Sequence, residues 1–168
     1  DPRVWMVRGE FQLRAGQNQA AARCFWEALK LHPDERTANY RLGELLRDLD
    51  RASDAQVFRQ RAADLQALKE IDDLMIAAGG VGSLDLIRRK VERLERMGRM
   101  WEAWGWAGLA AGRDAAAGWT VEAVERIEKQ LVSADVESAP GLTRRSSNPA
   151  LALDLSEWSR PEWSVESI

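Results

Sequence analysis

The side chains that could do chemistry are few in this 168-residue sequence, and they are scattered. His32 is the only histidine, so a catalytic triad or a histidine-rich metal site lacks its parts. It precedes Pro33, and this position favours a role as the last residue of a helix over a role as a general base. Cys24 is the only cysteine, which excludes an internal disulfide and a paired-cysteine zinc site. It lies in a stripe of small and apolar residues, where a thiol behaves as a compact hydrophobe, although a redox role stays open.

Two further features resemble sites but have simpler interpretations. The acidic pairs Asp72-Asp73 and Glu92/Glu95 accompany many arginines at helical spacing, which favours solvated helix faces with ion pairs. The glycines of residues 79–82 follow no strand and precede no Gly-Lys-Ser/Thr, so they indicate a bend rather than a phosphate loop. We therefore expect no catalytic residues, no cofactor and no metal site.

The composition narrows the classes of partner. Charged residues make up 30% of the chain and the net charge is only -3, so there is no large basic field for nucleic acid or an anionic membrane. Hydrophobic residues make up 45%, enough for a real core. No run of about 18 apolar residues is present, so we expect no direct membrane insertion. The sequence starts at Asp1-Pro2 without an initiator Met, and we expect it to be a processed chain or part of a longer one.

Small residues recur at a fixed interval, and the helices that they predict must position any functional site. Gly9, Ala21 and Ala28 recur 34 residues later as Gly43, Ala55 and Ala62. This interval is a known period of paired-helix repeats. Small residues at helix crossings let two antiparallel helices approach closely, while large side chains fill the space beside them. The repeat predicts an all-α fold built from helical hairpins, with an unrelated helical bundle as the alternative.

The apolar spacing and the turn residues divide the chain into a helical domain over residues 1–133 and an extended linker or wrapping arm over residues 134–168. We expect Thr120 to cap the last helix, which would cover the end of the stack. Leu and Trp residues give the arm too much apolar surface to stay solvated, so part of it should dock on the helices or on something else. The expected helical units span 2–33, 36–78 and 83–115, followed by a covering helix over 120–133.

The first unit carries a recognisable pattern of residue types. It consists of Trp5, Arg8, Gly9, Gln12, Ala21, Phe25, Ala28 and Pro33. This pattern resembles the tetratricopeptide repeat (TPR) and implies an α-solenoid of hairpins. Arg8 and Gln12 depart from the Leu and Tyr that the family prefers. The second unit departs further, with Asn39, Leu46, Arg59 and Ala67 at the Trp, Tyr, Phe and Pro places. Ala103 and Ala110 keep the spacing of Ala21 and Ala28 in a third, degenerate unit.

The resemblance implies a protein-protein interaction scaffold, because the first helix of each unit lines a concave groove that takes an extended peptide or protein segment. The groove residues implied here are mixed in charge with an excess of Arg, which suits an acidic or carboxylate-bearing peptide. The alternative is that these arginines only solubilise the helices. The implied groove residues are Arg3, Met6, Glu10, Leu13, Arg14, Thr37, Tyr40, Arg41, Glu44, Arg47, Arg88, Arg89, Glu92 and Arg96.

Tryptophan is unusually frequent, with eight residues. Trp101 and Trp104 share a helix face, whereas Trp106 points elsewhere, so this helix needs a second cover. The cover is either the arm or last helix, or a partner. Trp158 and Trp163 of the arm are further candidate interface aromatics. An alternative function is therefore a structural subunit, held in a larger complex by the Trp-rich region and the arm.

A second resemblance concerns the whole order of the chain. It is similar to bacterial proteins that place tetratricopeptide repeats before an integrin-like or UnbV β-propeller domain. This resemblance implies that the chain is the helical part of a larger, exported protein. The residues that carry it are Arg41-Leu42-Gly43-Glu44-Leu45-Leu46, Met100-Trp101-Glu102-Ala103-Trp104 and Asn148-Pro149-Ala150-Leu151-Ala152-Leu153-Asp154-Leu155-Ser156.

Overall fold

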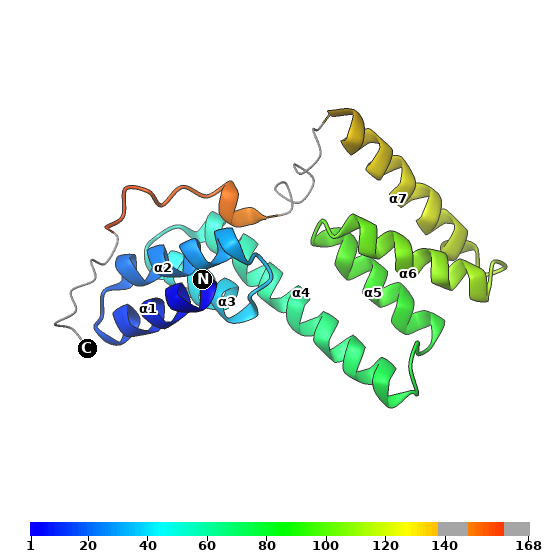
Figure 1. Cartoon of the computed structure of the whole chain (residues 1–168), viewed down its shortest axis with the longest axis horizontal. Helices are drawn as coiled ribbons and strands as arrows, with labels where there is room; N and C mark the ends of the chain where they lie inside the picture. Colours follow the sequence, from blue (N-terminus) through cyan, green and yellow to red (C-terminus); the bar gives the residue numbers. More distant parts are fainter. Residues whose placement is uncertain (138–147, 160–168) are drawn as a thin grey trace. The chain divides into compact units, whose positions relative to one another are not determined.

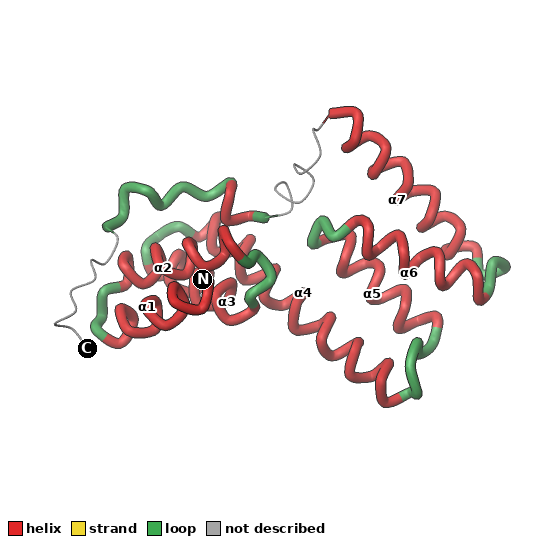
Figure 2. The backbone as a smooth tube through the Cα atoms, in the orientation of Figure 1, coloured by secondary structure: helices red, strands yellow, loops and turns green. Residues whose placement is uncertain are grey.

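The computed structural model describes residues 1–137 and 148–159, and the regular secondary structure of these residues is helical, without any strand. Consecutive helices pair as hairpins (Figures 1 and 2), which confirms the expected all-α hairpin array. Within this part of the chain, the helices are α1 (Pro2–Arg14), α2 (Asn18–Leu31), α3 (Arg36–Asp48), α4 (Ala52–Ala77), α5 (Leu84–Arg96), α6 (Met100–Arg113) and α7 (Gly118–Glu137), with a 3-10 turn, η1 (Pro149–Leu151).

Local sequence signals set the helix ends. The Asp1 carboxylate accepts the Arg3 backbone N–H at 2.8 Å, and the Ser83 hydroxyl accepts that of Leu86 at 3.3 Å, so both residues cap a free helix start. Helix α4 ends just before the predicted glycine bend, where Gly79 and Gly80 have φ values of +83° and +134°. These left-handed angles favour glycine and stop the helix.

One expected cap is wrong. We predicted Thr120 as the cap of the last helix, but α7 already begins at Gly118. The buried Thr120 hydroxyl instead donates to the carbonyls of Asp114 and Ala117, at 3.1 and 2.9 Å. The Asp114 carboxylate accepts the backbone N–H groups of Ala116 and Ala117 at 3.0 and 3.2 Å. Asp114 therefore organises the turn, and Thr120 ties the first turn of α7 back to it.

The chain forms two compact units, each with its own core. The first comprises Asp1–Ala63 together with Asn148–Ile168, and the second comprises Asp64–Ser147. Helix α4 contributes residues to both. The described part of the arm thus belongs to the first unit, although it follows the second unit in the sequence.

The core of the first unit forms where the repeated small residues allow close approach. At Gly9 of α1, an added Cβ would lie 2.7 Å from Cε1 of the buried Phe25 ring of α2. At Gly43 of α3, an added Cβ would lie 3.2 Å from the carbonyl oxygen of Ala55 in α4. Both glycines therefore mark helix crossings, as the repeat predicted. The buried residues of this core are Ala21, Ala22, Phe25, Trp26, Leu29, Ala38, Leu42, Leu45, Leu46, Ala55, Phe58, Ala150, Leu153 and Leu155.

In the second unit, α6 packs against both α5 and α7. Ala103 and Ala110 are fully buried, so the third pair of small residues also lies at helix contacts. A buried ion pair adds to this core: the Asp64 carboxylate is 3% exposed and accepts from Arg93 and Arg96 of α5 at 2.9 and 2.7 Å. The other buried members are Leu68, Ile71, Met75, Ile87, Val91, Leu94, Met97, Ala107, Ala123, Ile127 and Leu131.

Candidate protein-binding surfaces

The implied groove residues of the first unit lie on α1 and α3, where several of their charges are already partnered. Arg41 Nε donates to Glu10 Oε1 at 3.1 Å, which joins α3 to α1. Arg47 pairs with Glu44 at 3.0 Å and with Asp48 at 2.9 Å. The side-chain hydrogen bond to Asp48 is the largest cause that raises the Arg47 pKa. These arginines hold carboxylates of their own chain, so an acidic ligand would have to compete for them.

The other implied residues of this unit differ in exposure. Tyr40 is 49% exposed and projects from α3. Met6 and Leu13 are half-buried and pack against the core, so they support α1 more than they present a surface. Arg3 is exposed at the first turn of α1. Tyr40 and Arg3, together with the exposed Arg14 at the end of α1, therefore offer accessible contact groups.

The second unit contains a cavity of about 140 Å³ that is lined by residues of α5 and α7. Two of the implied groove residues, Arg88 and Glu92, line it, whereas the exposed Arg89 does not. The remaining lining residues are Val91, Trp119, Glu122, Ala123 and Arg126. The cavity therefore combines an apolar floor with a rim of both charges.

Charge pairs and an aromatic ring order this rim. Arg88 Nε donates to Glu92 at 3.2 Å, and its guanidinium carbon lies 5.8 Å from the centre of the Trp119 ring. Arg126 makes two hydrogen bonds to Glu95, at 3.1 and 2.9 Å, and this contact is the largest cause that raises the Arg126 pKa. Both arginines remain about half exposed, with side-chain exposures of 55% and 49%. The rim can bind a carboxylate if Arg88 exchanges its Glu92 partner for it.

The Trp-rich helix α6 packs against α5 and α7, and these two helices leave part of its aromatic surface exposed. Trp101 and Trp104 meet edge to face, with ring centres 6.2 Å apart, and Trp104 Nε1 donates to Glu128 of α7 at 3.0 Å. Trp101 remains 60% exposed. Trp106 packs against the core, and Lys90 lies over its ring at 4.1 Å. The last helix thus covers part of the aromatic surface and leaves Trp101 accessible.

Of the two candidate interface tryptophans of the arm, the structure describes Trp158. Trp158 is half-buried against the first core, with the Arg51 guanidinium carbon 5.9 Å from its ring centre. Trp163 lies outside the described residues. The described arm docks on helices of its own chain, which is one of the two outcomes we had left open.

Sequence reasoning missed the surface on which the arm docks. All residues from Ala21 to Leu29 of α2 are buried, including the polar side chains of Arg23 and Glu27. A helix buried all round needs a cover on every face, and the arm supplies one of them. Trp26, beside the expected Phe25, was the available signal, because it places a second large aromatic outside the hairpin contact.

Metal binding, membrane crossing and catalysis by His32 or Cys24 find little support in the part of the chain that the structure describes. No three His, Cys, Asp or Glu side chains gather there as metal ligands. None of its helices has the length and apolar character needed to cross a membrane. His32 is the residue that ends α2, as expected from Pro33. Burial raises the pKa of the Cys24 thiol to about 11, so this thiol is a poor nucleophile at neutral pH.

Comparison with known protein families supports the residue pattern of the first unit. The family model for the tetratricopeptide repeat matches residues 2–45, which run from α1 through most of α3. No curated protein matches the chain.

Proposed function

We propose that the chain, whose residues 2–45 match the tetratricopeptide repeat, is a non-catalytic scaffold that binds a protein or peptide segment on the surface of α5 and α7. Such repeats mediate protein–protein interaction through the extended surfaces that stacked hairpins create. The observation that carries the proposal is the cavity on α5 and α7, which is lined by the implied groove residues Arg88 and Glu92. It supplies what a peptide contact needs, namely an apolar recess with charged groups at its rim.

The chemistry of this cavity suggests the kind of segment. Trp119, Val91 and Ala123 offer apolar surface for one side chain. Arg88 can form charge-assisted hydrogen bonds to a carboxylate of the same segment, releasing Glu92. Both charges occur on the rim, so a polyanion gains little there. We therefore propose a peptide with one apolar anchor next to a single Asp or Glu.

Peptides selected from a random displayed library on the full-length chain test this function. Arg88→Glu should weaken binding of the selected peptides by about tenfold or more, because it replaces an attraction with a repulsion at the cavity rim. Arg89→Glu is the matched control, since this exposed neighbour carries the same charge outside the cavity. Equal losses of affinity for both variants would show that net charge alone causes the effect and would count against the cavity. Unchanged binding for Arg88→Glu would overturn the proposal.

A second candidate is a structural subunit of a larger complex. Val4, Val7 and Phe11 of α1 are 46%, 71% and 60% exposed. The residues 34 positions after the first and last of these, Ala38 and Leu45, are 0% and 4% exposed in α3, which packs against α2. Helix α1 thus exposes an apolar face, whereas the equivalent face of α3 is covered by α2.

Substitution on this face separates the two candidates. If the chain is a permanent subunit, Phe11→Asp should release it from its native complex in sedimentation, whereas Arg88→Glu should not. A groove-binding scaffold predicts the reverse pattern. Deletion of the arm is a poor test, because Ala150, Leu153 and Leu155 belong to the first core.

A further inference from the structure

Three side chains of α2 form a stripe under the arm. Arg23, Trp26 and Leu29 follow at intervals of three residues, so they lie along one side of the helix. They are only 4%, 6% and 1% exposed. We call these three residues the α2 stripe, and residues 148–158 the arm segment. In Figure 1 the arm segment runs beside α2, which agrees with their shared core.

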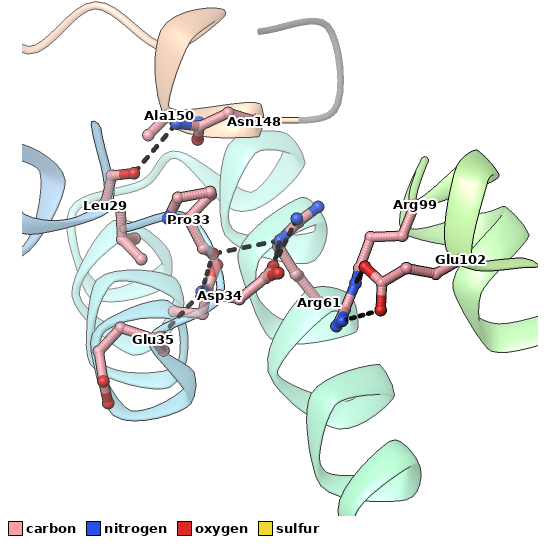
Figure 3. Close-up of polar contacts among 10 residues, drawn as sticks. Leu29, Pro33, Asp34, Glu35, Arg61, Arg99, Glu102, Asn148 and Ala150 are labelled. Atoms are coloured by element: carbon pink, nitrogen blue, oxygen red, sulfur yellow. Dashed lines mark hydrogen bonds and ion pairs between the residues drawn. The ribbon is translucent and has the colours of Figure 1, made fainter. Parts of the chain in front are cut away.

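The polar contacts of the stripe capture the arm backbone. Trp26 Nε1 donates to the Ala150 carbonyl at 2.6 Å, and Arg23 Nη1 donates to the Leu155 carbonyl. In the other direction, Asn148 Nδ2 donates to the Leu29 carbonyl at 3.0 Å, near the end of α2 (Figure 3). The Asn148 carboxamide oxygen accepts the Ala150 N–H at 3.0 Å, which fixes the first turn of the segment. The Ala150 carbonyl belongs to the 3-10 turn η1, and the Leu155 carbonyl belongs to the non-helical residues that follow it.

The apolar contacts determine which side chains of the arm segment the site accepts. Ala150, Leu153 and Leu155 are 0%, 7% and 1% exposed, whereas Leu151 is 46% exposed. Asp154 lies between the two buried leucines and points outward, as alternate residues of an extended chain do. The site therefore requires a small residue and then two large apolar ones at fixed positions.

The stripe is held in place by α2 itself. Glu27 accepts from Arg23 at 3.0 Å and from Lys30 at 2.7 Å. The Arg23 guanidinium carbon and Lys30 Nζ lie 4.5 and 3.9 Å from the centre of the Trp26 ring. All of these contacts are within one helix, so the contacts that orient Arg23 and Trp26 here do not depend on the arm. Such preorganisation is typical of a binding site.

We propose that the α2 stripe is a peptide-binding site in its own right, and that the arm segment is its built-in ligand. The site takes a peptide that begins with a 3-10 turn, with Asn first, Ala two residues later and Leu five and seven residues later, as in Asn148, Ala150, Leu153 and Leu155. Another segment of this pattern has to displace the arm. The site lies on α2, so it is independent of the surface proposed above, which lies on α5 and α7.

A nicked form of the full-length chain tests this proposal. A protease recognition sequence replaces residues 141–146, and the chain is cut after folding. The probe is a fluorescent synthetic peptide of residues 148–158, added to cut and uncut protein at nanomolar concentration. We expect the cut chain to bind it about 100-fold more tightly, because cutting removes the high effective concentration of the tethered arm.

Peptide variants provide the matched controls without altering the folded chain. A peptide with Leu153→Asp should bind at least about 30-fold more weakly, because it would bury a charge in the apolar core. Leu151→Asp, at an exposed position, should bind like the original. Equal affinity of cut and uncut chains, or of both peptide variants, would overturn the proposal. Loss of helical circular dichroism on cutting would also overturn it, because the arm would then be an inseparable part of the core.

Discussion

At the scale of single residues, the function of a glycine depends on what stands beside it. Gly9 lies against the buried Phe25 ring, and an added methyl group would come within 2.7 Å of it. Gly105 in α6 has no such neighbour within 4 Å. Both lie inside helices, where Ala is preferred over Gly by about 1 kcal/mol when space allows. The two positions therefore separate packing from helix propensity.

We predict opposite effects of the same substitution at these positions. Gly9→Ala should lower the free energy of unfolding by about 2 kcal/mol, because overpacking against the ring exceeds the gain in propensity. Gly105→Ala should raise it by up to about 1 kcal/mol. Urea unfolding followed by circular dichroism measures both. A stabilising Gly9→Ala would mean that the crossing of α1 and α2 does not require a glycine.

The single thiol gives a prediction with a defined pH range. Burial is the largest cause that raises the Cys24 pKa, from 9.0 to about 11, so the folded chain keeps a proton that the unfolded chain loses above pH 9. Between pH 9 and 11 the unfolded state therefore binds fewer protons, and the free energy of unfolding falls as the pH rises, by about 2 kcal/mol from this group.

Comparison with Cys24→Ala isolates this contribution from lysine and tyrosine titration. The difference in unfolding free energy between the original chain and the variant should be constant below pH 9. It should then shift by about 2 kcal/mol against the original chain by pH 11. A difference that stays flat across the whole range would contradict a buried, neutral thiol.

At the scale of elements, one buried carboxylate secures α4 to α5. Asp64 is 3% exposed and binds two arginines of α5, whereas Asp73 of the same helix is 60% exposed and pairs with Lys69 in a surface contact. We predict that Asp64→Ala lowers the free energy of unfolding by about 2–3 kcal/mol. Asp73→Ala should change it by less than about 0.5 kcal/mol. Thermal unfolding measures both, and similar losses for the two variants would contradict the importance of burial.

The sequence predicted elements well where the signal was local or periodic. The 34-residue recurrence of Gly and Ala identified the hairpins, since close helix contacts need small residues at fixed spacing. It could not reveal the docking of the arm, because Trp26 and Ala150 are 124 residues apart and share no period. Nor could it show that Arg41 would pair with Glu10, since that ion pair depends on how two helices meet. The groove residues were implied by resemblance, and their role stays a prediction.

At the scale of the whole molecule, the order of residues along the chain differs from their grouping in space. Leu153 follows the second unit in sequence, yet it is buried in the core of the first. Ile127 is fully buried in the core of the second. In hairpin arrays, stability is a sum of local terms and nearest-neighbour contacts, so each core should respond mainly to its own losses.

We predict that Leu153→Ala raises native-state hydrogen exchange in α1 to α3 and leaves α5 to α7 unchanged. Loss of a buried Leu costs at least about 2 kcal/mol, which corresponds to roughly a 30-fold rise in exchange through unfolding of that unit. Ile127→Ala is the reciprocal control and should act on α5 to α7 only. Helix α4 is left out of the comparison because both units contain part of it. Equal acceleration in all helices by either variant would mean that the two cores unfold as one, because coupling through α4 would then exceed the local loss.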